Sequence, residues 1–137
     1  MKTAILSALL FLMPQTAPSI PKNDPNGVWQ SESGSAYKFQ LNGSDLKVQI
    51  VDGSNPKYIK YEVNLKVDPK ETNTYRGTGS YVAKMNGGKE CKFDTDWEIL
   101  VVSTEQIFGQ STLVNADSAT CEVKGTEKGL LDLKKKK

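Results

Sequence analysis

The residues of this chain whose chemistry could matter most are a row of carboxylates in the stretch CKFDTDWEILVV, residues 91–102. Asp94, Asp96 and Glu98 occupy every second position there. Two carboxylates flanking a sugar bond can act as the general acid and the nucleophile of a glycosidase. Clustered carboxylates can also bind calcium. The first question is therefore whether this row forms a reactive or metal-binding centre.

The alternation of the same stretch argues against both chemistries. Phe93 and Trp97 share one phase with other apolar residues, and the carboxylates occupy the opposite phase, so on a strand the row points away from the core. A glycosidase acid needs a pocket that raises its pKa, and calcium needs about six to eight oxygens converging from a folded loop. An open strand face offers neither, and we expect the row to be the solvent-facing side of a strand.

Other catalytic centres lack the residues that they require. The chain contains no His, which excludes Ser-His-Asp and Cys-His sites and His-ligated zinc. Its two cysteines do not form a CxxC motif. The glycine-rich stretches at 77–80 and 86–90 precede no predicted helix that could hold a phosphate. The sequence predicts a protein that is not an enzyme and has no metal site and no cofactor.

The N-terminus has the pattern of a secretory signal peptide. Lys2 precedes an apolar run at residues 4–13, and small or polar residues follow. The run is shorter than the roughly 20 residues of a spanning helix; a buried N-terminal helix is the alternative. We predict a signal peptide at residues 1–19 and an exported protein, periplasmic or extracellular, that does not span the membrane.

In an exported chain, the even number of cysteines favours a disulfide between Cys91 and Cys121, and two free buried thiols are the alternative. Such a bond would add about 3 kcal/mol of stability by closing a loop of about 30 residues.

The distribution of charge excludes one class of partner. Without Lys2 and the lysines at 134–137, the chain has 13 basic and 16 acidic residues, a net charge of −3. No basic domain remains that would bind nucleic acid. We interpret residues 134–137 as a solvated tail.

The rest of the chain reads as a series of strands. Apolar and polar residues alternate strictly at residues 58–67, with Ile59 and Tyr61 in the predicted buried phase. Asn42-Gly43 and similar turn signals separate such runs, and no helical stripe occurs. After an extended lead-in at residues 20–26, we predict a domain at 27–133 with strands at 27–32, 35–42, 45–52, 57–67, 73–85, 91–103, 105–114 and 119–133.

Short connections between these strands favour an all-β fold, an antiparallel up-and-down barrel of about eight strands. A two-layer β-sandwich is the alternative. The cysteines complicate the barrel, because strands two apart are separated by roughly 10 Å, whereas a disulfide needs Cα atoms within about 7 Å. Either the cysteines lie in loop segments at one barrel end, or the strand order is not a simple meander.

The first predicted strand carries a family resemblance. Gly27-Val28-Trp29, on the opening strand of an eight-stranded meander, resembles the GxW motif of the calycins, which include the lipocalins, the fatty-acid-binding proteins and the avidins. The resemblance implies that Trp29 packs at the closed end of the barrel and does not contact a ligand.

Inward-facing aromatic and small residues could line a ligand cavity. The alternative is that they fill the barrel, because eight strands leave little room inside. The leading hypothesis is a secreted or periplasmic, lipocalin-like binding protein that holds a small apolar ligand. The cavity candidates are Tyr61, Tyr75, Gly77, Gly79, Tyr81, Phe93 and Trp97.

A second resemblance favours a different class, a protein–protein interaction module. Ser33-Gly34-Ser35-Ala36-Tyr37 is similar to the SGxxY string of periplasmic inhibitors of c-type lysozyme. The resemblance implies a loop at residues 32–36, with Ser33, Gly34, Ser35 and Tyr37, that enters the active cleft of a secreted protein. An ordinary tight turn followed by a buried strand explains the same residues.

Overall fold

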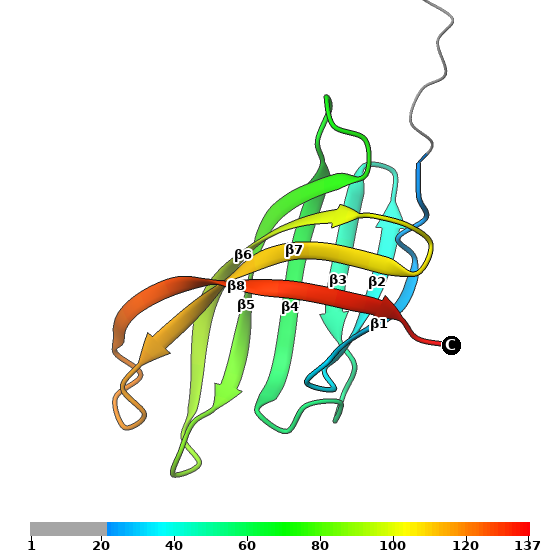
Figure 1. Ribbon diagram of the computed structural model, residues 1–137. Coiled ribbons are helices and arrows are strands. Elements are labelled where there is room, and N and C mark those ends of the chain that lie inside the picture. Colours follow the sequence, from blue (N-terminus) through cyan, green and yellow to red (C-terminus); the bar gives the residue numbers. More distant parts are fainter. Residues whose placement is uncertain (1–21) are drawn as a thin grey trace, which may run out of the picture.

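The computed structural model describes residues 22–137 and folds them as a closed antiparallel barrel (Figure 1). Each strand pairs with the next, and the first pairs with the last. The predicted all-β up-and-down barrel is confirmed, and the sandwich is excluded. The predicted signal peptide at 1–19 lies outside the described residues. The strands are β1 (Gly27–Ser31), β2 (Ala36–Asn42), β3 (Asp45–Ile50), β4 (Tyr58–Val67), β5 (Thr74–Lys84), β6 (Glu90–Val101), β7 (Gln106–Ala116) and β8 (Val123–Lys135).

The lead-in segment closes one end of the barrel. Trp29 is fully buried on β1 and donates a hydrogen bond from its Nε1 to the Pro25 carbonyl oxygen at 2.8 Å. Asn23 donates from its side chain to the Val101 carbonyl at the end of β6. Segments far apart in the sequence therefore meet over Trp29, which lies at the closed end as the calycin resemblance implies.

The core follows the strand alternation that the sequence predicts. Every second residue of β6 is buried along its whole length. Around the closed end the inward side chains are mostly aliphatic. The following are at most 1% exposed: Leu46, Val48, Val63, Leu65, Ile99, Val101, Ile107 and Leu133. Burying a side chain of this kind stabilises a fold by about 1.5–3 kcal/mol.

Several strand ends differ from the predicted ones by a few residues, and two differences change where side chains lie. The register between β4 and β5 shifts between Tyr58 and Lys60, and Ile59 is 44% exposed. Ile59 was predicted to face inward; the irregularity turns it outward and places Tyr58 against the aromatic core instead. Near the C-terminal side, Lys134 and Lys135 belong to β8 and pair with β1, so half of the predicted tail at 134–137 is strand.

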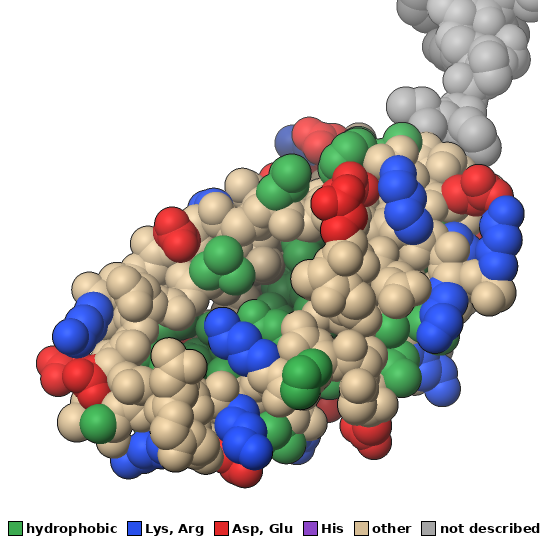
Figure 2. Space-filling model, turned by 60° about the horizontal axis from the view of Figure 1, so that its bottom comes forward, with side chains coloured by type: hydrophobic (Ala, Val, Ile, Leu, Met, Phe, Trp, Pro, Cys, Tyr) green, Lys and Arg blue, Asp and Glu red, His purple; other side chains and the backbone are tan. Residues whose placement is uncertain are grey.

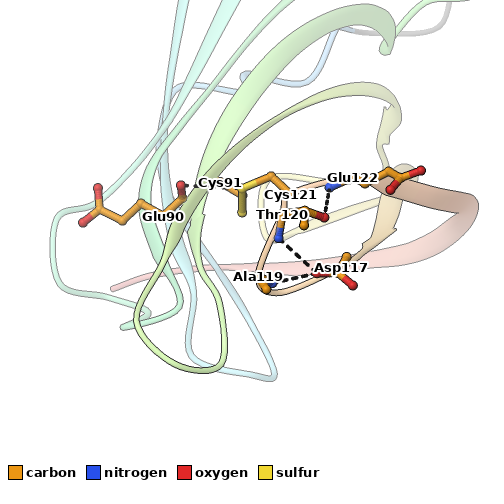
Figure 3. Close-up of a disulfide and its surroundings, with 7 residues drawn as sticks. All are labelled: Glu90, Cys91, Asp117, Ala119, Thr120, Cys121 and Glu122. Atoms are coloured by element: carbon orange, nitrogen blue, oxygen red, sulfur yellow. Dashed lines mark hydrogen bonds between the residues drawn. A yellow bond between two sulfur atoms is a disulfide. The ribbon is translucent and has the colours of Figure 1, made fainter.

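The disulfide forms between Cys91 and Cys121, with a Cα–Cα distance of 5.5 Å (Figure 3). The strand order is a simple meander, so the conflict of distances must be resolved locally. Cys121 is not in a strand, contrary to the predicted strand at 119–133, because β8 begins at Val123. Asp117 organises the intervening turn: its carboxylate accepts the backbone N–H groups of Ala119 and Thr120 at 2.8 and 3.0 Å.

The wall of the barrel is incomplete between β6 and β7. β6 pairs with β5 along nearly its whole length, from Glu90 to Leu100, but with β7 only from Trp97 to Val101. Beyond that point the β7–β8 hairpin turns away from the β5–β6 hairpin (Figure 1). We call the space between residues 92–96 of β6 and 112–116 of β7 the β6–β7 gap. The disulfide closes its far end.

Candidate functional site

Six aromatic side chains pack against one another inside the barrel, and we call them the aromatic cluster. Tyr61 and Tyr81 stack with ring centroids 4.9 Å apart. Tyr58 meets both rings edge-on at 5.4 Å. These arrangements are the ones that aromatic pairs prefer. The members come from β2, β4, β5 and β6: Tyr37, Tyr58, Tyr61, Tyr81, Phe93 and Trp97.

Two polar atoms of the aromatic cluster hydrogen-bond to each other. Trp97 donates from Nε1 to the Tyr61 hydroxyl oxygen at 3.0 Å. Burial raises the pKa of Tyr61, and hydrogen bonds with Trp97, Thr95 and Ser111 partly offset that rise. Burial likewise raises the pKa of Tyr81 to about 12. The tyrosines are therefore neutral at physiological pH, and the cluster forms an uncharged aromatic surface.

The structure brings together only some of the predicted cavity residues. Tyr61, Tyr81, Phe93 and Trp97 belong to the aromatic cluster. Tyr75 is also buried, but it lies toward the closed end, where it pairs with Ile99 on β6. Burial raises the pKa of Tyr75, and the nearby charge of Asp24 adds to that rise.

Gly77 and Gly79 face the backbone of β4. A Cβ on Gly77 would overlap the Asn64 carbonyl oxygen, and one on Gly79 would overlap that of Glu62. The space that these glycines leave is filled by the neighbouring strand, which permits the bend of β5.

The barrel opens beside the aromatic cluster, and this mouth contains apolar residues that the sequence pattern did not indicate. Tyr58, Met85 and Val114 are only partly buried where they pack against the core. Figure 2 brings this lower end of the barrel forward and shows hydrophobic side chains within a hollow, with charged side chains around it. Tyr58 was missed because strict alternation assigns it to the solvent phase. The preceding turn signal at 52–56 was the only hint that the strand begins irregularly.

The predicted interaction loop is half buried. Glu32 and Ser33 are exposed, and Gly34 adopts a positive φ of 95° with open space beside it. Ser35 is 2% exposed, and its hydroxyl accepts a hydrogen bond from the Asn55 side chain at 2.7 Å. Tyr37 is 5% exposed within the aromatic cluster. Only the tip of the SGxxY-like string is accessible to a partner.

The carboxylate row points away from the core, as predicted, and its side chains are exposed. The pKa of Asp96 lies below its usual value because Thr112 and Lys128 hydrogen-bond to its carboxylate. Glu98 pairs with Arg76, whose pKa is raised by hydrogen bonds with Glu98 and Asp68. The lowered pKa of Asp96 is the opposite of what a general acid requires.

The surface beside the row is not an open face, and this corrects the sequence interpretation. A groove of about 940 Å³ runs over the outer face of β5 and β6 beside the β6–β7 gap. Hydroxyls and charges of both signs line it, including Ser80, Lys92, Asp94, Thr112 and Lys128. The sequence could not indicate this groove, because it arises from the departure of the β7–β8 hairpin from β6.

A second outer hollow, of about 670 Å³, has a more apolar wall. Leu100, Phe108 and Leu130 contribute to it and are 44%, 40% and 80% exposed. Between residues 22 and 137, no group of three or more His, Cys, Asp or Glu side chains is arranged to hold a metal ion. The same residues include no helix long and apolar enough to cross a membrane.

The described residues define a closed, eight-stranded antiparallel barrel, an architecture consistent with a calycin-like fold in general. No protein-family model, curated protein or solved structure matches the chain.

Proposed function

We propose that this chain is an exported, non-enzymatic binding protein that holds a small apolar ligand at the mouth of its aromatic cluster. The observation that carries the proposal is the partly exposed apolar mouth formed by Tyr58, Met85 and Val114 over stacked, neutral aromatic rings. Ligand sites are typically concave and apolar, with a few polar groups that orient the ligand. The hydroxyls of Tyr61 and Tyr81 lie deeper in the same end.

Because the aromatic rings contact one another, the ligand would lie over them at the mouth rather than in a deep interior chamber. A disulfide is typical of proteins from an oxidising, exported environment, and the Cys91–Cys121 bond supports that location. The exposed carboxylates and the lowered pKa of Asp96 support a non-catalytic role.

The test is a titration of the folded, oxidised protein with N-phenyl-1-naphthylamine, a neutral probe that fluoresces in apolar surroundings. We expect saturable binding and quenching of tryptophan emission. Tyr58→Ser should weaken probe binding at least tenfold, and Leu130→Ser, which removes an exposed apolar side chain on the outer surface, should leave it unchanged. No saturable binding, or loss of binding in Leu130→Ser alone, would contradict the proposal.

The alternative is an interaction module for a secreted protein, acting through the loop at 32–36. The exposed tip formed by Glu32, Ser33 and Gly34 favours it. Inhibition of a c-type lysozyme by the wild-type chain, and its loss in a Ser33→Arg variant, would support this function. Undiminished lysozyme activity at a large molar excess of the chain would exclude this enzyme as the target.

A further inference from the structure

The edge of β6 along the β6–β7 gap has no partner strand. The ladder with β7 ends at the pair Trp97 and Ser111, whereas the ladder with β5 continues to Glu90. Residues 92–94 are therefore paired on one side only, whereas Thr95 and Asp96 are joined to Thr112 of β7 by side-chain hydrogen bonds. An unpaired strand edge is a template for another extended chain.

The main-chain groups that face the gap can be assigned from hydrogen bonds at the end of β6. The backbone N–H of Val101 donates to Asn73 on the β5 side, and that of Val102 donates to Gln106 on the β7 side. Successive residues of a strand direct their backbone groups to opposite neighbours. The N–H and C=O groups of Lys92 and Asp94 therefore face the gap.

The opposite edge of the gap is partly occupied. The Thr112 carbonyl accepts a hydrogen bond from Thr95 Oγ1 at 3.0 Å, and the Thr112 hydroxyl hydrogen-bonds to the Asp96 carboxylate. Among the described residues, the gap-facing main-chain groups of Lys92 and Asp94 have no such partner, so β6 is the edge that can accept a partner strand.

A partner can reach the edge of β6 from outside the barrel through the groove of about 940 Å³. Its wall includes Lys92, Asp94 and Asp96, the outward side chains of the free edge. On the inward side of the same edge lie Phe93 and Thr95. A segment that pairs with this edge would meet charged groups on one face and apolar or hydroxyl groups on the other.

We infer that the free edge of β6 binds an extended peptide segment of a partner protein, which adds as an antiparallel strand along residues 92–94. Main-chain hydrogen bonds provide affinity in this mode of recognition, and alternate side chains provide specificity. Charge complementarity predicts that the bound segment has a Lys or Arg opposite Asp94 and an acidic residue opposite Lys92. The residue between them, opposite Phe93, should be apolar. The hydrogen bonds of Thr95 and Asp96 with Thr112 and the disulfide at Cys91 limit the paired part of the segment to about three residues.

The probe is the peptide acetyl-Lys-Thr-Lys-Val-Glu-amide, whose last three residues lie opposite Asp94, Phe93 and Lys92 and whose first two residues extend beyond the paired part. We expect saturable shifts in the nuclear magnetic resonance signals of residues 92–96. We also expect at least tenfold slower hydrogen exchange at the Lys92 and Asp94 amides. Signals from Tyr58 and Met85 should not move, which separates this site from the proposed apolar site.

Methylated peptides test whether the main chain carries the binding. Methylation of the third and fifth amides, which would face β6, should weaken binding at least tenfold. Methylation of the second and fourth amides, which would face away from β6, should change it only a few-fold. Asp94→Pro should also abolish binding while preserving the near-ultraviolet circular dichroism of the folded protein.

Three outcomes would overturn the inference. One is the absence of shifts at millimolar peptide. Another is equal binding of the two methylated peptides, which would show that side chains alone attract the probe. Shifts confined to Leu100, Phe108 and Leu130 would place the peptide in the second hollow and would equally overturn it.

Discussion

The two halves of β6 share the same alternation of buried and exposed residues, but different interactions hold each half in the barrel. From Trp97 to Val101 the strand has backbone partners on both sides, and Ile99 and Val101 are 1% exposed. In residues 92–96 the strand has a backbone partner only on the β5 side, and it is linked to the β7–β8 hairpin by the disulfide and a few side-chain hydrogen bonds. The comparison shows that a strand can keep a regular buried face while its edge remains free. Four predictions test it.

The largest effect is expected in the paired half. Ile99→Ala should lower the free energy of unfolding by about 2–5 kcal/mol, because it leaves a cavity in a closely packed region. Val114→Ala, in the diverging hairpin, should cost about 1 kcal/mol, because Val114 is only partly buried. Urea denaturation monitored by tryptophan fluorescence measures both. Equal costs would mean that the two halves are packed equally well.

Removal of the disulfide is expected to have the next largest effect. The double variant Cys91→Ser and Cys121→Ser should lose about 3 kcal/mol, since the bond closes a 30-residue separation. Native-state hydrogen exchange should accelerate most in residues 112–122 and least in β2 and β3. A uniform acceleration would show that the disulfide does not act on the diverging hairpin in particular.

A matched pair of prolines distinguishes the two halves through the backbone alone. Glu98→Pro removes an N–H that faces β7 within the ladder, and it should cost about 2 kcal/mol or more because Gln110 loses its partner. Asp94→Pro removes an N–H that faces the gap, and it should cost less than about 1 kcal/mol.

Glu98→Ala is the control, because it removes the exposed ion pair with Arg76 but keeps the backbone donor. Such a pair contributes at most about 1 kcal/mol. If Asp94→Pro proves as destabilising as Glu98→Pro, the edge at residue 94 is already hydrogen-bonded.

The smallest effect concerns alkaline pH. The fold raises the pKa of Tyr81 from 10.0 to about 12, so the neutral hydroxyl contributes stability that is fully present below pH 10 and is lost as the pH rises through 12. Tyr81→Phe keeps the ring packed and removes only the group that ionises, so it should cost at most about 1 kcal/mol at pH 7. Its stability should then fall less steeply than that of the wild type between pH 10 and 12. Urea denaturation across this range measures the slopes, and equal slopes would contradict the prediction.

Alternation within the sequence was sufficient to predict the barrel and most inward residues. Phe93, Trp97 and Ile99 face the core because the period of a strand leaves no other arrangement once one face is apolar. The prediction for Ile59 was wrong because the register shift at Tyr58 changes which residues face inward. The alternation of residues in the sequence does not reveal such a shift. The position of Cys121 was ambiguous for a similar reason, since alternation does not mark where a strand begins.

The groove and the free edge could not be predicted from any single segment. Alternation reports which face of a strand is buried, but not whether a second strand runs beside it. Lys92 and Asp94 look the same in sequence whether or not β7 continues past Trp97. The extent of the β6–β7 ladder depends on how the β7–β8 hairpin coils, and Gly109, which lies against the backbone of β6, is the local feature that permits the close contact before the divergence.

The meeting of β1 with β8 has a consequence for how the chain could be rearranged. Among the described residues, seven ladders join consecutive strands, and only the β1–β8 ladder joins the first strand to the last. The Lys136 N–H donates to the Val28 carbonyl at 2.8 Å, so the end of β8 lies beside β1. A circular permutant that links the end of β8 to the start of β1 and opens in the loop between β3 and β4 would convert the β1–β8 closure into a local hairpin. It would make the β3–β4 ladder the final long-range closure, and thereby relocate the slowest contact of assembly without changing one residue of the core.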